Sequence, residues 1–247
     1  MAPPVIVGVA GASGSGKTCI ASLIEKRLQG VSVVSISSDS YYRGLKEGSD
    51  ASKHNWDHPD ALDLDLLSQH LMDLREGRDV HVPVYNFSTH SRDKDNAVFV
   101  SAHDTDVIIV DGIFVLCVEK LRKAFDLTLF TVEDLDVCLV RRLRRDIAER
   151  GRSIESVLLQ YMMFVRPGYT NFIEPSRSFA DILVPRARDN HIAIEMVSVW
   201  CGCYAIFICL ASLLCYVHWR PSQPHNPPQP PHSLFNRLQR RSQDALV

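Results

Sequence analysis

The chain has 247 residues, a length that suits one α/β domain with an appendage. Its 27 Lys and Arg residues against 29 Asp and Glu give a net charge of −2, which excludes a nucleic-acid partner bound through bulk positive charge. The 7 cysteines form no disulfide framework and the first residues lack the features of a secretory signal, so a cytoplasmic location is expected.

Short apolar runs alternate with helical patterns through the first 195 residues. The expected strands are rich in β-branched residues, which predicts buried central strands, and they cover 5–10, 31–36, 107–110, 127–132 and 181–184. The expected helices cover 18–28, 63–76, 135–149 and 154–165. This alternation predicts an α/β fold with a mostly parallel sheet and helices on both of its faces.

The segment GASGSGKT matches the phosphate-binding pattern GxxxxGK[ST] in full. It follows an expected strand and opens an expected helix, which is the context that this motif requires. Its backbone amides can surround phosphates, while Lys17 can reach the β- and γ-phosphates and the Thr18 hydroxyl can bind Mg²⁺. The sequence therefore predicts a nucleoside triphosphate site at Gly11, Ala12, Ser13, Gly14, Ser15, Gly16, Lys17 and Thr18.

Two acidic residues follow expected strands at the sheet edge where ligands of open α/β folds bind. Asp39, in SSDSYY, could accept a hydroxyl proton and contact the metal shell. Asp111 closes the third expected strand, in the position of a Walker B carboxylate. Thr18, Asp39 and Asp111 are therefore the candidate metal ligands, and turn capping is the competing interpretation of both acids.

Six arginines lie on and just after the helix expected over 135–149, at positions 141, 142, 144, 145, 150 and 152. Charge runs of this kind usually form a solvated face, and about half of these residues are expected there. Arg142 and Arg145, however, share one helix face, and Gly151 permits a turn between Arg150 and Arg152. We expect residues 150–153 to form a lid whose arginines stabilise a transferring phosphoryl group.

From about Val5 to Met196 the chain resembles the uridine kinases, also called uridine–cytidine kinases. The segments that carry the resemblance are GASGSGKT, SSDSYY, NWDHPDALD, VPVYNFSTHSR, RRLRRDIAERGR, QYMMFVRP and ADILVPRARDN. The resemblance implies a P-loop NTPase-type fold with a small β-hairpin for nucleoside binding. It also implies a homo-oligomer that phosphorylates the 5′-hydroxyl of uridine and cytidine with ATP (or GTP) and Mg²⁺.

The same resemblance implies roles for individual residues. Asp39 would be the catalytic base, and Asp57, helped by Arg142 and Gln160, would bind the ribose hydroxyls. The pyrimidine would be read by two residues of the hairpin, Tyr85 and His90. The remaining implied positions are Tyr42 beside the acceptor, Arg145, Arg150 and Arg152 in the lid, with Arg152 also near the substrate, and Asp189 near the adenine. The family usually has Glu where this chain has Asp111, so a water-mediated metal contact is expected there.

The resemblance stops near residue 196, where the composition changes abruptly. Residues 196–219 contain no Lys, Arg, Asp or Glu, and six of the 13 prolines fall in 221–231. We expect a kinase domain at 1–197, an atypical apolar segment at 198–219 and a Pro-rich, basic, disordered tail at 220–247. The apolar residues 196–219 admit three interpretations: a membrane anchor, translated non-coding sequence, or a helix buried in an oligomer.

Two other functions stay open at this point. The altered C-terminal part favours a non-catalytic or membrane-tethered form that binds nucleotide and modulates normal subunits. Alternatively, the chain could be a kinase for another small metabolite, against which Tyr85 and His90 argue because they favour a pyrimidine.

Overall fold

The computed structural model describes residues 3–45 and 54–218, with the side chains of the last helix described as far as residue 205. Residues Met1–Ser212 form one compact unit. The predicted tail at 220–247 lies outside the described residues.

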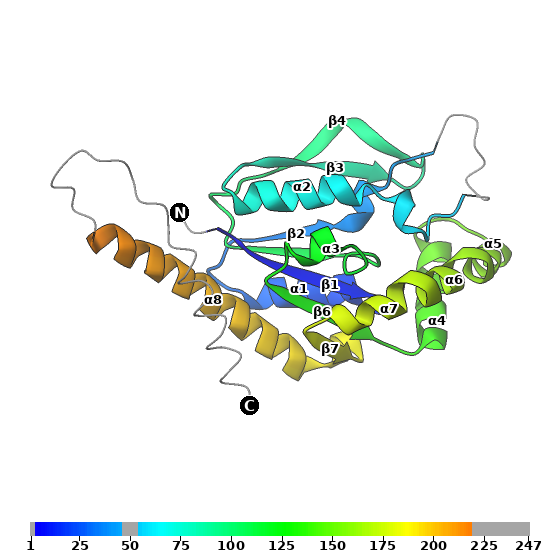
Figure 1. Cartoon of the computed structure of the whole chain (residues 1–247). Coiled ribbons are helices and arrows are strands. Elements are labelled where there is room, and N and C mark those ends of the chain that lie inside the picture. The colour runs from blue at the N-terminus through cyan, green and yellow to red at the C-terminus, as the bar shows by residue number, and fades with distance from the viewer. Residues whose placement is uncertain (1–2, 46–53, 219–247) are drawn as a thin grey trace. The chain divides into compact units, whose positions relative to one another are not determined.

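A five-stranded parallel sheet forms the centre of this unit (Figure 1), and its strand order is β2-β5-β1-β6-β7. The strands are β1 (Val5–Gly11), β2 (Val33–Ser37), β5 (Val107–Asp111), β6 (Leu127–Val132) and β7 (Ile182–Pro185). The parallel sheet is thus confirmed, and each strand begins and ends within two residues of its predicted bounds. The prediction of five buried central strands is wrong for β2 and β7, which are edge strands and only partly buried, because each pairs with a strand on one side.

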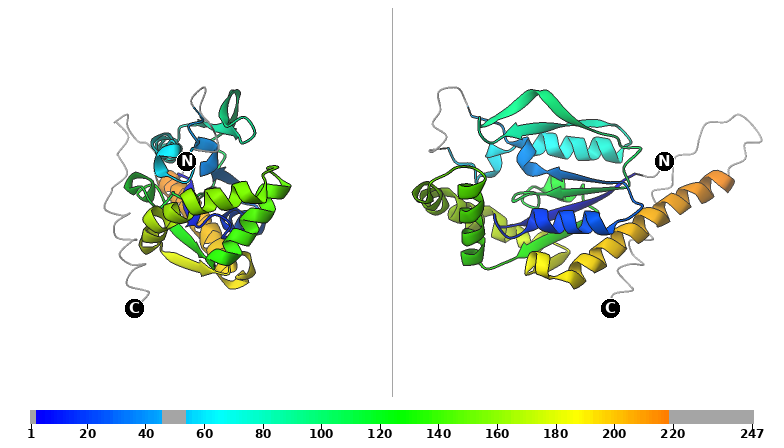
Figure 2. Two further views of the ribbon diagram at one scale, coloured as in Figure 1. Left: turned by 90° about the vertical axis from the view of Figure 1, so that its right-hand side faces the viewer. Right: turned by 180° about the vertical axis from the view of Figure 1, so that it is seen from behind.

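Helices cover both faces of the sheet (Figures 1 and 2). The alternating side chains of β1 divide the core, since Ile6 packs with α2 (Leu64–Arg75) and α3 (Glu119–Arg122), while Val7 packs on the opposite face with α1 (Lys17–Arg27). This two-sided burial is what the continuous apolar sequence of the central strands predicts.

Two helical segments follow β6 and lie beside the phosphate-binding loop. The first is α4 (Leu135–Ala148), and α5 (Ile154–Gln160) begins a longer helical rod. That rod continues through a π-helical turn (Tyr161–Val165), α6 (Arg166–Gly168), a second π-helical turn (Tyr169–Ile173) and α7 (Glu174–Ser176). Single π-helical turns inside helices are frequent at functional sites.

A separate antiparallel hairpin is formed by β3 (Val80–Asn86) and β4 (Ser91–Val100). Val82 and Val100 bury one side of it against the core on the α2 side of the sheet. Its turn ends at His90, which adopts a left-handed backbone conformation with φ of 52°. The hairpin expected from VPVYNFSTHSR is present.

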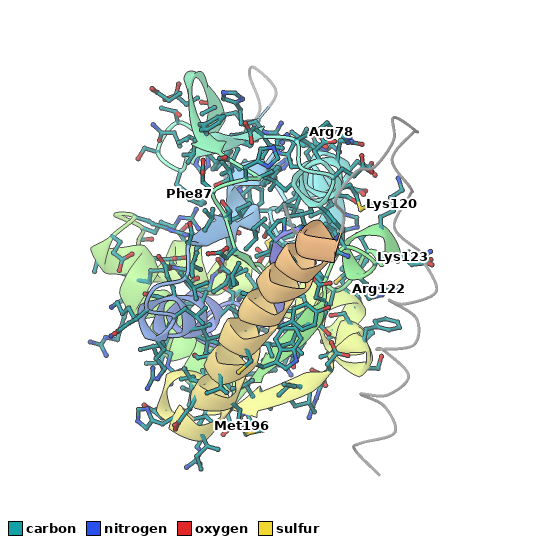
Figure 3. All side chains as sticks on the ribbon, turned by 90° about the vertical axis from the view of Figure 1, so that its left-hand side faces the viewer. Arg78, Phe87, Lys120, Arg122, Lys123 and Met196 are labelled. Atoms are coloured by element: carbon teal, nitrogen blue, oxygen red, sulfur yellow. The ribbon has the colours of Figure 1, made fainter. Side chains whose placement is uncertain are left out.

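The family resemblance ends within the first turns of the last described helix, α8 (His191–His218). Ile194, Val197 and Cys201 are buried in the core on the α1 face, whereas Met196 is 64% exposed on the other side of the helix (Figure 3). The predicted apolar segment at 198–219 therefore begins in contact with the core, and its side chains from residue 206 onwards lie outside the described ones. Among the helices that could be searched, none is long and apolar enough to cross a membrane.

Candidate active site

The loop between β1 and α1 is compact, and a side chain at the start of α1 binds back to the backbone of the loop. Lys17 donates a hydrogen bond from Nζ to the Ala12 carbonyl oxygen at 2.8 Å, and Gly16 precedes the helix with φ of 95°. A Cβ on Gly14 would lie 2.4 Å from the Cys138 carbonyl oxygen, so α4 can pack against the loop only where this position is glycine. The loop therefore presents the backbone amides of a helix N-terminus to an open cleft, as an anion requires.

That cleft, of about 740 Å³, contains both positive and negative groups. Burial lowers the pKa of Lys17, and the nearby Asp111 and Asp39 partly oppose this shift. Thr18 donates from Oγ1 to Asp111 Oδ2 at 2.8 Å, and burial raises the pKa of Asp111 against the effects of that bond and of Lys17. Hydroxyl and carboxylate oxygens are the protein ligands that Mg²⁺ accepts, so Thr18 and Asp111, with Asp39 close by, fit the metal that accompanies a nucleotide.

A second cavity, of about 550 Å³, adjoins the first, and Ser13, Asp39, Ile113 and Arg145 line both. It gathers side chains from six parts of the chain: the phosphate-binding loop, the segment after β2, residues 56–57, the hairpin, the segment after β5 and the α4–α5 region. The sequence-predicted residues that line it are Ser13, Asp39, Tyr42, Asp57, Tyr85, His90, Arg142, Arg145, Arg150, Arg152 and Gln160. Every acceptor-side residue implied by the family resemblance therefore meets at one place.

Asp57 forms the polar floor of this second cavity. Its carboxylate is buried and lies 3.6 Å from Arg142 Nη1, and its backbone amide donates to Asn55 Oδ1 at 3.0 Å. Burial raises the pKa of Asp57, while the charge of Arg142 lowers it. Gly168 packs closely against the backbone of Asp57, since a Cβ at residue 168 would lie only 2.3 Å from the Asp57 carbonyl oxygen.

Aromatic rings form one wall of the cavity. Tyr42 and Tyr85 lie with ring centroids 5.3 Å apart, and Trp56 stacks on His90 at 5.1 Å with an interplanar angle of 20°. Burial lowers the pKa of His90, and the charge of Arg152 lowers it further. Trp56 therefore packs against the ring of His90 beside the cavity.

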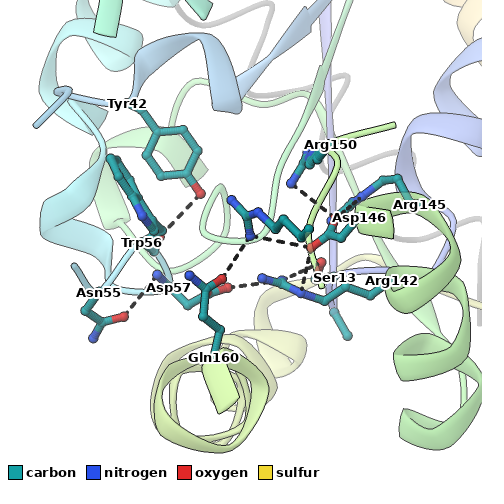
Figure 4. A network of polar contacts seen from close by, with 12 residues as sticks. Ser13, Tyr42, Asn55, Trp56, Asp57, Arg142, Arg145, Asp146, Arg150 and Gln160 are labelled. Carbon is teal, nitrogen blue, oxygen red and sulfur yellow. Dashed lines mark hydrogen bonds and ion pairs between the residues drawn. The ribbon is translucent and has the colours of Figure 1, made fainter. Parts of the chain in front are cut away.

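Four arginines of the α4–α5 region converge on one carboxylate, Asp146, which is fully buried (Figure 4). Sequence reasoning missed Asp146, although its spacing of four residues from Arg142 on a helix is a signal for such a pair. Ser13 was predicted only as part of the loop, and its Oγ accepts a hydrogen bond from Arg142 Nη1 at 3.1 Å, which links the two cavities.

Asp189 lies apart from the other predicted site residues. It ends the short turn Ala187–Asp189 before α8 and does not line either of the two cavities described above. The turn itself touches the loop, since a Cβ on Gly16 would lie 2.7 Å from Ala187 Cβ. The implied role of Asp189 near the adenine stays a prediction.

Comparison with known proteins is consistent with this arrangement. Residues 6–193 match the model of the phosphoribulokinase / uridine kinase family. The uridine kinase of Macrococcus caseolyticus is 44% identical over 200 residues, which cover 80% of this chain and 96% of that protein. Uridine-cytidine kinase A of Dictyostelium discoideum is 45% identical over 195 residues, covering 79% of this chain but only 38% of that longer protein.

The fold recurs among solved structures. Phosphoribulokinase from Rhodobacter spheroides superposes with a TM-score of 0.56 at 19% identity, covering 74% of this chain and 70% of that one. At this level of identity the likeness shows a shared fold.

Proposed function

The chain belongs to the phosphoribulokinase / uridine kinase family, and from this premise we propose that it transfers the γ-phosphoryl group of ATP, or GTP, to the 5′-hydroxyl of uridine and cytidine. One observation carries the proposal: Asp39 stands where the phosphate-binding cleft meets the aromatic cavity, and it lines both. A base at this junction is within reach of a nucleoside hydroxyl in one cavity and of a terminal phosphate in the other.

The aromatic cavity suits a pyrimidine nucleoside. Tyr42 and Tyr85 offer ring faces to a flat base, while His90 supplies a polar edge for base recognition. Asp57 can accept hydrogen bonds from both hydroxyls of a ribose, with Arg142 and Gln160 as donors beside it.

The loop side suits a triphosphate. Gly11 to Thr18 surround the phosphates with backbone amides, and Lys17 and Arg145 add positive charge. Mg²⁺, for which Thr18, Asp39 and Asp111 are the proposed ligands, would neutralise charge on the transferring phosphoryl group.

The chain's own residues then perform two tasks. Asp39 takes the proton of the 5′-hydroxyl while the oxygen of that hydroxyl attacks the γ-phosphorus. The bond between the γ-phosphorus and the oxygen of the leaving diphosphate breaks in the same step. Lys17, Arg145, Arg150 and Arg152 stabilise the charge spread over the transferring oxygens while the closed cavity positions the acceptor.

Assembly and location complete the proposal. A homo-oligomer in the cytoplasm, with the kinase domain at 1–197, is what the family resemblance favours for this chain. Light scattering on the purified full chain tests the assembly.

The test of activity uses the purified full chain with Mg²⁺–ATP and a panel of acceptors: uridine, cytidine, nicotinamide riboside and pantothenate. We expect phosphorylation of uridine and cytidine, and a loss of about 10²–10⁴-fold in kcat for Asp39→Asn, which retains the shape but removes the base. Asp104→Asn, an exposed change of the same kind, is the control and should keep full activity. Phosphorylation of another acceptor in preference to both pyrimidine nucleosides would refute the proposed substrate, and near-normal turnover of Asp39→Asn would refute the proposed base.

A further inference from the structure

Asp146 lies in the interior of the cation cluster, on α4, and is not exposed to solvent at all. Its carboxylate lies within 3.6 Å of guanidinium nitrogens of Arg142, Arg145, Arg150 and Arg152. A carboxylate that is fully buried needs nearby positive charges to compensate its own charge, and the four arginines supply this compensation. Asp146 touches neither proposed substrate cavity, so its effect must pass through the arginines.

The two carboxylate oxygens serve different arginines. Oδ1 accepts from Arg145 at 2.8 and 2.9 Å and lies 3.4 Å from Arg150 Nη1. Oδ2 lies 3.5 Å from Arg142 Nε and 3.6 Å from Arg152 Nη1. Oδ2 and Arg142 Nε are both buried without a hydrogen-bond partner, so this side of the carboxylate holds its arginines less tightly than the other.

The Oδ2 arginines face the acceptor. Arg142 Nη1 lies 3.6 Å from Asp57 Oδ1, at the floor of the aromatic cavity. Arg152 donates from Nη1 to Gln160 Oε1 at 2.9 Å. Burial lowers the pKa of His90 and the charge of Arg152 lowers it further, whereas burial raises the pKa of Tyr85 to about 12 and the charge of Arg152 opposes that rise. Arg142 and Arg152 therefore both belong to the proposed nucleoside half of the site.

Of the two Oδ1 arginines, Arg145 faces the phosphates. It lines the phosphate-binding cleft, and its charge helps to lower the pKa of Lys17, which burial lowers most. Arg150 lines the aromatic cavity instead, with its guanidinium 4.6 Å from the centroid of the Phe87 ring. A polyphosphate in the cleft would compete with Oδ1 for Arg145.

From this division we infer that Asp146 is a positioning residue that couples the two halves of the site, an inference that rests on the proposed function. When the donor's phosphates draw Arg145 away from Oδ1, more of the carboxylate charge is free to act on Arg142 and Arg152. The two acceptor-side arginines are then held more firmly against the nucleoside, so nucleotide binding tightens nucleoside binding. By linkage, the nucleoside tightens nucleotide binding by the same factor.

Calorimetry of uridine binding to the full chain, without and with a saturating non-hydrolysable ATP analogue and Mg²⁺, measures this coupling. For the wild type we expect the analogue to lower the uridine Kd by about 5-fold or more, the usual range of coupling between two sites. Asp146→Asn keeps the shape but removes the charge, so the ratio of the two Kd values should fall to below about 2. Glu149→Gln, an exposed change of the same kind near the end of the same helix, should leave the ratio at the wild-type value.

A second variant changes the arginine that Asp146 binds most closely. Arg145→Lys keeps the positive charge but removes the paired guanidinium contacts to Oδ1. The Arg145 side chain is 33% exposed, so we expect the fold to tolerate the substitution. We expect its coupling ratio to fall as well, whether or not Asp146→Asn folds.

The outcomes separate coupling from simple structural support. If the variants weaken uridine and nucleotide binding but leave the ratio unchanged, Asp146 only supports the cluster and the inference is overturned. A wild type that binds both ligands with a ratio of 1 overturns the inference and leaves the proposed function intact. A wild type that binds the nucleotide analogue but no pyrimidine nucleoside overturns the proposed function itself.

Discussion

The imidazole of His90 lines the cavity proposed for the nucleoside, so its charge state affects how that acceptor binds. It is stacked on Trp56 and faces the charge of Arg152, and burial together with that charge lowers its pKa below the ordinary value of 6.5. The neutral ring therefore persists through neutral pH, and it titrates only when the pH falls below that value. Protonation would place a second positive charge beside Arg152, which disfavours the closed aromatic wall.

We predict that uridine affinity is constant from pH 8 to about 6.5 and weakens as the pH falls further, through the lowered pKa of His90. In His90→Gln, whose side chain does not titrate, the decline of uridine affinity in acid should be much shallower, whatever the affinity at neutral pH. Calorimetric Kd values across this pH range provide the measurement, with His103→Gln, an exposed histidine, as the control. An equally steep decline in His90→Gln would assign the titration to another group, such as Asp57, whose pKa burial raises.

Single residues of the site differ in how far the sequence could predict them. The loop from Gly11 to Thr18 is local, so spacing alone places it correctly next to a strand and a helix. Asp57, Tyr85 and Arg142 are distant in sequence, and only the family resemblance joined them before the structure brought them to one cavity. The resemblance implied no role for Asp146. Its importance follows from the four arginines that surround it in space, and only the structure shows that arrangement.

At the scale of elements, the helical rod from α5 to α7 departs most from sequence expectation. The helical pattern predicted an end at residue 165, and two prolines that normally break a helix follow, Pro167 and Pro175. In the structure each proline lies in a short α-helical segment directly after a π-helical turn, and the rod continues through both. Such turns depend on tertiary packing, so sequence periodicity could not reveal them.

The rod brings Gly168 against the backbone of Asp57, and this contact can be tested. A Cβ at residue 168 would lie 2.3 Å from the Asp57 carbonyl oxygen, so either the rod or residue 57 must move. We predict that Gly168→Ala lowers the free energy of unfolding by about 1–3 kcal/mol, as overpacking typically does, and raises the KM for uridine more than that for ATP. Chemical denaturation and steady-state kinetics measure the two effects.

Gly202→Ala is the matched control for that substitution. It also replaces a helical glycine, but its new Cβ would meet Leu28 Cδ2 at an ordinary 3.6 Å. This variant should be neutral or gain about 0.5–1 kcal/mol, because alanine loses less backbone entropy in a helix. Unchanged stability and uridine KM in Gly168→Ala would show that the close approach to Asp57 plays no part in holding the acceptor.

At the scale of the whole molecule, charge is distributed unevenly. The chain carries a net charge of −2, yet Lys17 and all the arginines of the α4–α5 region except the exposed Arg144 line two adjoining cavities. A nucleotide must therefore be held by a local concentration of cations against an overall negative field. Only the folded chain brings these cations together, so a nucleotide binds the folded state and not the unfolded one. Nucleotide binding therefore raises the free energy of unfolding.

We predict that a non-hydrolysable ATP analogue with Mg²⁺, at 100 times its Kd, stabilises the full chain by about 2.7 kcal/mol. For a chain of this size that stabilisation corresponds to a rise in Tm of about 5–11 °C. Lys17→Gln should lose most of the shift, because it removes the cation that donates to Ala12 and faces the phosphates. Lys26→Gln, an exposed change of equal charge on the same helix, should keep the shift, and differential scanning calorimetry compares the three proteins. An equal Tm rise in Lys17→Gln would mean that the analogue binds outside the loop, and the donor site would then have to be reassigned.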